Sequence, residues 1–221
     1  MQAMFLYCKF PEGFTLGDKF DTSEVTKMNS MFYGCNFPKG FTFGDKFNTF
    51  SVIDMNSMFC ESTISKGFSL GDKFDTSNVE GMNLMFCGST LPEGFTLGDK
   101  FDTSSVKFFS QMFYNCGKLP VGFTLGDKFD IHSAININSM FFGCSLQEGF
   151  TLGDKFDTSN VEDMRWLFAY CKLPEGFSLG NKFNTSSVKY VAYMFRSCKF
   201  PEVFTLGDKF DVSHIPDVGN D

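Results

Sequence analysis

The stretch GFTLGDKF, residues 13–20, decides the fold because the chain returns to it, or to a close variant, at a nearly constant interval. The later copies begin at Gly40, Gly67, Gly94, Gly122, Gly149, Gly176 and Val203. The interval is 27 residues except for one of 28, where an extra residue falls near Gly117. Self-similarity at a fixed period of this length is typical of repeat architectures.

Within this stretch, Phe14 and Leu16 alternate with Thr15, which is the two-residue period of a short strand with one buried face. Gly17 then permits a turn that a side chain would hinder. We therefore predict one strand element in each copy, at 13–20, 40–47, 67–74, 94–101, 122–129, 149–156, 176–183 and 203–210.

Between these elements lies a second pattern, in which Val25, Met28, Met31 and Phe32 are spaced i, i+3, i+6 and i+7. The spacing predicts one face of a short helix. A strand, a turn and a short helix cannot bury their own apolar faces, so copies are expected to stack. The prediction is a single leucine-rich-repeat-like solenoid over residues 1–221, with about eight coils, a parallel β-ladder, and both ends cut within a repeat.

The segment DTSNVEDMRWLFAYC, residues 157–171, and its counterpart at 75–86 resemble the BspA-like bacterial surface-protein repeats. That family is a branch of the leucine-rich repeats and occurs in surface proteins and lipoproteins. The resemblance implies a leucine-rich-repeat-like solenoid, a cell-surface or extracellular setting, and adhesion to proteins or other cells. It supplies no catalytic residues.

Composition excludes several classes of function. The net charge of −7 disfavours nucleic acid, which needs clustered and unopposed Lys and Arg. No apolar run is long enough to span a membrane, and the first residues, MQAMFLYCKF, lack the pattern of a signal peptide. We expect no cofactor and no catalytic residues, since His132 and His214 are three copies apart and cannot act together.

Two acidic columns are candidate sites. The column that begins at Asp18 is followed by Lys in each copy, so paired charges are expected there rather than a calcium or other metal site. The second column admits Asn as well as Asp, which indicates a structural side-chain acceptor for N–H groups of turns. Its members are Asp21, Asn48, Asp75, Asp102, Asp130, Asp157, Asn184 and Asp211.

Cysteine occurs once per copy. Neighbouring copies offer the pairs Cys8 and Cys35, Cys60 and Cys87, Cys116 and Cys144, and Cys171 and Cys198. Stacked Cα atoms fall within disulfide range, but parallel Cβ atoms lie slightly too far apart. We favour buried thiols, and the sequence leaves disulfides open.

Positions at which copies differ are the better place to seek function, because the shared positions already build the scaffold. The column of Ser30 becomes Trp166 and Tyr193 in later copies, so these two aromatic residues should be neighbours. With Arg165, Tyr190 and Phe108 they form the predicted binding residues, since Trp, Tyr and Arg are enriched at binding hot spots. The alternative is that they pack against a flanking helix or cap.

The sequence therefore predicts a non-enzymatic surface module that binds protein or glycan. A structural alternative is end-to-end self-association through uncapped ends into fibres. A minor alternative is binding of ordered water or ice by the exposed hydroxyl stripe that begins at Thr15 and Thr42.

Overall fold

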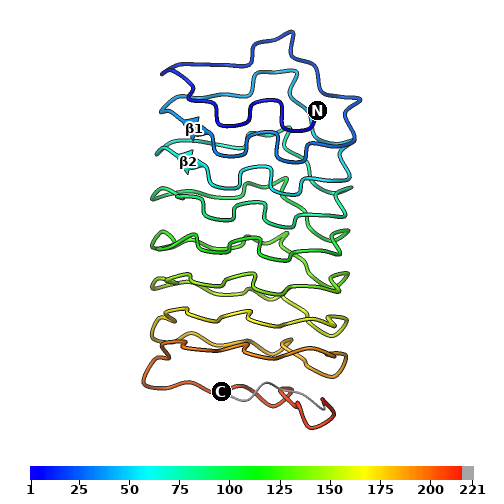
Figure 1. Ribbon diagram of the computed structural model, residues 1–221, viewed down its shortest axis with the longest axis vertical. Helices are drawn as coiled ribbons and strands as arrows, with labels where there is room; N and C mark the ends of the chain where they lie inside the picture. The colour runs from blue at the N-terminus through cyan, green and yellow to red at the C-terminus, as the bar shows by residue number, and fades with distance from the viewer. Residues whose placement is uncertain (216–221) are drawn as a thin grey trace.

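The computed structural model describes residues 1–215, and the chain winds into a stack of coils with the N-terminal coils at one end and the C-terminal coils at the other (Figure 1). Two strands form, β1 at Asn36–Phe37 and β2 at Thr63–Ile64. They pair in parallel, with Asn36 opposite Thr63. The described part of the chain contains no helix, and therefore none that could cross a membrane.

The predicted leucine-rich-repeat-like solenoid of strand, turn and helix is wrong. The segments predicted as strands, from 13–20 to 203–210, hold no strand, and those predicted as helices consist of turns. The regularity comes instead from backbone hydrogen bonds between consecutive coils. Ser30 N–H donates to Asn56 C=O at 2.9 Å, for example, and Phe32 N–H donates to Met58 C=O at 3.0 Å.

Consecutive turns replace the predicted helix. Met31 N–H bonds to Met28 C=O at 3.1 Å, and Cys35 N–H bonds to Phe32 C=O at 3.3 Å, whereas the alternate N–H groups leave the coil. A helix would send every N–H to the fourth residue back. Positive φ at Ser30, 53°, and at Gly34, 66°, closes the turns. Met28, Met31 and Phe32 are fully buried, as their spacing predicts, but on consecutive turns rather than on a helix.

Glycine conformation explains why the predicted strands are missing. Gly13 and Gly17 both have positive φ, 70° and 76°, which leaves too few extended residues between them for a strand. Thr15 and Thr42 still form one parallel bridge. The long parallel ladder runs elsewhere, as single-residue bridges in the order Lys27, Asp54, Gly81, Phe108, Asn136, Asp163 and Tyr190.

A column of stacked phenylalanine rings forms the centre of the core. Successive ring centroids are 5.3–5.8 Å apart and the planes lie within 3–9° of parallel. The column consists of Phe5, Phe32, Phe59, Phe86, Phe113, Phe141, Phe168 and Phe195. Offset stacking of this kind adds to the burial energy of each ring. The 32 Phe residues of the chain thus reflect ring columns that pass from coil to coil.

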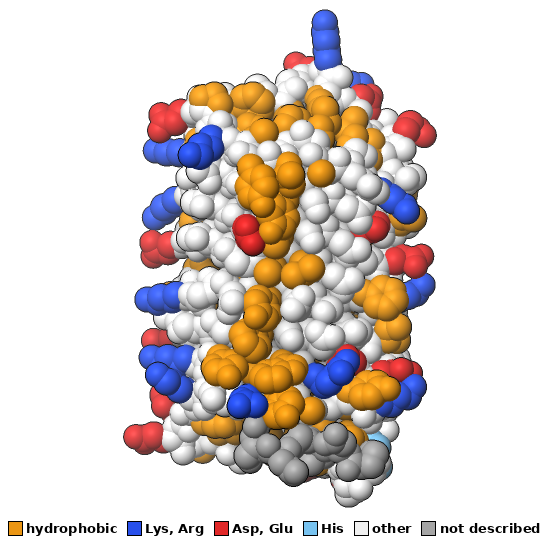
Figure 2. All heavy atoms as spheres, in the orientation of Figure 1, with side chains coloured by type: hydrophobic (Ala, Val, Ile, Leu, Met, Phe, Trp, Pro, Cys, Tyr) orange, Lys and Arg blue, Asp and Glu red, His pale blue; other side chains and the backbone are white. Residues whose placement is uncertain are grey.

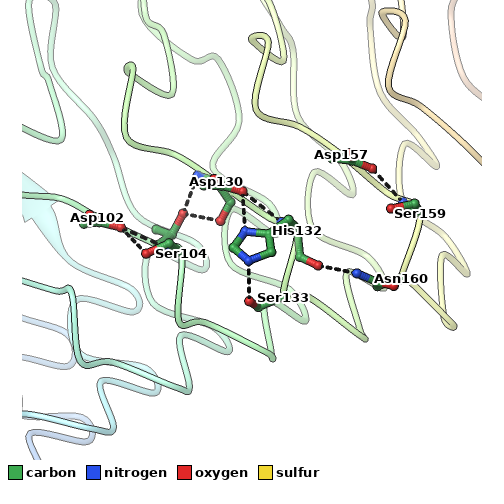
Figure 3. A network of polar contacts seen from close by, with 9 residues as sticks. Asp102, Ser104, Asp130, His132, Ser133, Asp157, Ser159 and Asn160 are labelled. Carbon is green, nitrogen blue, oxygen red and sulfur yellow. Dashed lines mark hydrogen bonds and ion pairs between the residues drawn. The ribbon is translucent and has the colours of Figure 1, made fainter.

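Polar columns flank the rings and hold each turn. The predicted structural acceptors are confirmed: every Asp or Asn of that column accepts a hydrogen bond from the backbone N–H two residues later, at 2.9–3.0 Å. Figure 3 shows three of these contacts, at Asp102, Asp130 and Asp157. The next residue is usually a buried Thr, whose hydroxyl donates to the following coil, as Thr76 does to Asp102 C=O at 2.7 Å.

Candidate functional site

A partly exposed cluster of rings and arginine lies on the C-terminal coils. We name Trp166, Tyr193, Arg196, Phe142 and Tyr170 the aromatic–arginine surface. The Trp166 and Tyr193 rings are 4.5 Å apart at 32°, as expected for neighbours in one column. The Arg196 guanidinium carbon lies 5.7 Å from the Trp166 ring centroid and 5.2 Å from that of Tyr193. One cation therefore lies over two adjacent rings.

The backbone of this column has a left-handed conformation in every coil. The φ angle is 53° at Ser30, 58° at Ser57, 53° at Ser139, and 61° at both Trp166 and Tyr193. The turn itself imposes this conformation, because residues of very different size adopt it. Side chains at the position are consequently exchangeable without a change of backbone. Trp166 and Tyr193 therefore occupy a turn position whose backbone conformation is the same in every coil.

Further rings extend the cluster toward the middle of the stack. Phe142 lies 6.1 Å from Trp166 and 5.1 Å from Tyr170, measured between ring centroids. Tyr114 stacks on Phe142 at 4.6 Å and 11°. The rings belong to three adjacent columns, those of Ser30, Tyr33 and Gly34. The surface thus joins consecutive coils into one apolar patch.

A second arginine lies beside this surface. Arg165 forms two contacts with the nearly buried Asp163, at 2.7 and 3.0 Å, and its guanidinium carbon lies 4.9 Å from the Tyr190 ring centroid. The Asp163 carboxylate raises the pKa of Arg165, so the guanidinium stays charged. Arg165 and Arg196 are the two arginines of the chain.

The structure divides the predicted binding residues into groups. Trp166 and Tyr193 stack directly, and Arg165 pairs with Tyr190. Phe108, which is 39% exposed, lies on the parallel ladder three coils before Tyr190 and belongs to neither group. Sequence reasoning missed Phe142, Tyr170 and Arg196, although the columns of Tyr33 and Gly34 also change composition toward the C-terminus.

Hydrophobic side chains form a band down the middle of the face seen in Figure 2, and most charged side chains lie along its two edges. The hydroxyl column that begins at Thr15 is exposed in every coil. Beside this column, four pairs of neighbouring coils line open hollows of about 460–500 Å³, whose lining includes Thr or Ser, Leu, Gly and Asp or Asn.

The structure does bring together a serine, a histidine and an aspartate, which sequence reasoning did not anticipate. His132 Nδ1 lies 2.9 Å from Asp130 Oδ1, and Nε2 lies 3.1 Å from Ser133 Oγ (Figure 3). The hydroxyl of Ser104 makes the same contact with Asp102, at 2.7 Å, one coil earlier. His132 thus takes the place of a turn serine, and its 57% exposed side chain lies on an open turn. We interpret this group as structural.

Within residues 1–215, no group of three or more His, Cys, Asp or Glu side chains is arranged to bind a metal ion. The sequence matches the family described as "Mycoplasma protein of unknown function, DUF285" in three overlapping segments, residues 1–118, 45–151 and 135–219. No curated protein and no solved structure matches it.

Proposed function

We propose that this chain, which belongs to the DUF285 family of Mycoplasma proteins of unknown function, is a non-enzymatic module that binds a protein or glycan partner through its aromatic–arginine surface. The contact of Arg196 with both Trp166 and Tyr193 supports this function most directly. Trp, Tyr and Arg dominate the energetics of protein interfaces, and aromatic rings present large, rigid contact areas at small entropic cost.

Local charge supports the same surface. Residues 161–200 contain six Lys or Arg and three Asp or Glu, whereas the whole chain has a net charge of −7. A partner that carries carboxylate or sulfate groups would meet favourable potential at this end of the stack and repulsion elsewhere. The cell-surface setting belongs to the same proposal and rests on the resemblance of residues 157–171 to surface-protein repeats.

A binding screen tests the proposal. The purified chain is applied to an array of soluble oligosaccharides and to a phage-displayed peptide library, and hits are titrated by the fluorescence of Trp166, the single Trp of the chain. Because Trp166 lies at the centre of the surface, a bound ligand should change its emission.

Variants then identify the surface. The double variant Trp166→Ser and Tyr193→Ser should fold normally, since Ser30, Ser57 and Ser139 occupy the same left-handed position. We expect it to lose at least about tenfold in affinity by surface-immobilised binding. The matched control is Phe108→Asn, which copies Asn136 from the next coil and removes an exposed ring outside the surface. Equal affinity of the double variant and the parent chain for every hit would refute the proposal.

A further inference from the structure

Two cysteines depart from the pattern of the other six. Cys60 and Cys87 stand in the column of Tyr33, in neighbouring coils. In those two coils, the usual cysteine position is occupied by Ser62 and Ser89. The exchange of position occurs in both coils together.

At the position of the other six cysteines, the side chain donates a hydrogen bond to a backbone carbonyl in the cases described below, and serine does the same. Cys116, Cys144 and Cys171 each donate their thiol to the backbone carbonyl of a core Phe in the preceding coil, at 2.8–2.9 Å. Ser62 Oγ donates to Phe32 C=O at 2.8 Å in the same way. Cysteine is therefore a small buried donor in that column, and its thiol hydrogen is engaged.

The thiols of Cys60 and Cys87 have no such carbonyl partner among the described contacts. The two residues are instead neighbours in one column of consecutive coils. Their side chains project from the stacked backbones of these coils, and the pKa of each thiol depends on the other. The two coils are hydrogen-bonded on either side of the pair, by Phe59 N–H to Met85 C=O at 2.9 Å and by Glu61 N–H to Cys87 C=O at 2.6 Å. Cys60 is buried, at 4% exposure, whereas Cys87 is partly exposed. A reagent therefore reaches Cys87 first.

We propose that Cys60 and Cys87 form an oxidisable dithiol, which a hydroperoxide converts to a disulfide between neighbouring coils. The Cys87 thiolate attacks one peroxide oxygen, so an S–O bond forms, the O–O bond breaks, and hydroxide or alkoxide leaves. The Cys60 sulfur then attacks Cys87 sulfur, the S–S bond forms, and the sulfenic oxygen leaves as water with the Cys60 proton. The two thiols supply the two electrons that reduce the peroxide.

Electrostatics at the pair agree with this order of events. Interaction with the Cys60 thiol lowers the pKa of Cys87 despite the opposing effects of burial and of Glu61. Interaction with Cys87, together with burial, raises the pKa of Cys60, which keeps its proton until the second step. In the neighbouring pair, the Cys116 contact and burial both raise the pKa of Cys144. Both thiols of that pair also donate to backbone carbonyls, so we use it as the matched comparison and expect it to react more slowly.

The test treats the folded full chain with hydrogen peroxide, alkylates the remaining thiols after unfolding, and maps them by peptide mass spectrometry. We expect two of the eight thiols to be lost first, recovered as one peptide pair that links Cys60 to Cys87 and is released by dithiothreitol. Loss of Cys116 or Cys144 at the same rate, or no linked peptide, would overturn the proposal.

Single substitutions separate the two steps. Cys87→Ser should abolish peroxide consumption, and Cys60→Ser should leave Cys87 reactive but arrest it as a sulfenic acid, which dimedone traps. The Tyr33 column accepts Ala169 and Phe142 in other coils, so both variants are expected to fold. Cys116→Ser is the control and should retain the parent rate. Equal peroxide consumption by Cys87→Ser and the parent chain would also refute the assigned order.

Discussion

Substitution of Thr103 measures how much the hydrogen bonds between coils contribute to stability. Its side chain is fully buried, and its hydroxyl makes two bonds to the next coil, donating to Asp130 C=O at 2.8 Å and accepting from Asp130 N–H at 2.8 Å. Thr103→Val keeps the shape of the side chain and removes both bonds. The Asp130 N–H and C=O groups are then left without these partners in a partly buried position.

Each unsatisfied buried polar group costs about 1–3 kcal/mol, so Thr103→Val should lower the free energy of unfolding by roughly 2–4 kcal/mol once the easier burial of a methyl group is included. Thr76 provides an internal scale, because its hydroxyl makes a single bond of this kind, to Asp102 C=O at 2.7 Å. Thr76→Val should therefore cost about half as much as Thr103→Val.

Urea denaturation followed by circular dichroism measures both changes, with an unchanged m-value showing that the folded state is intact. The control is Thr96→Val, in the exposed hydroxyl column, for which we expect less than about 0.5 kcal/mol. If Thr103→Val destabilises the chain no more than Thr96→Val does, the buried threonine bonds do not hold the coils together, and this account of the stack is wrong.

Two further predictions concern the turns. Gly98→Ala, at φ 83° in open space, should cost about 1–2 kcal/mol from backbone strain alone, whereas Gly44→Ala should cost more because its Cβ would lie 2.8 Å from a backbone oxygen of the preceding coil. Equal urea midpoints for the two variants would contradict this. At Asp102, burial raises the pKa, but hydrogen bonds from Ser104 and nearby lysines outweigh it and lower the pKa overall. Its contribution is therefore present above the unfolded pKa of about 3.9 and lost as pH falls through the lower folded value. Ser104→Ala should reduce the amount by which the free energy of unfolding falls between about pH 7 and pH 3. If that fall is the same in the variant and the parent chain, the hydrogen bond from Ser104 does not lower the pKa of Asp102.

The candidate sites show where sequence reasoning reached its limit. It paired Trp166 with Tyr193 because the two share a column, and their rings do stack. It missed Arg196 and Phe142, because contacts between different columns depend on how the turns project their side chains. It also grouped Cys60 and Cys87 with three other cysteine pairs, since spacing along the chain does not show which thiols already have carbonyl partners.

The sequence by itself determined the period, the buried identity of Met28, Met31 and Phe32, and the acceptor role of the Asp and Asn column. Each of these follows from composition at fixed spacing. Tertiary structure decided the backbone. Spacing of i, i+3, i+6 and i+7 places side chains on one side in a helix and in consecutive turns alike. The choice depends on whether N–H groups bond within the coil or to the next one, as Ser30 does to Asn56, and that partner lies 26 residues away.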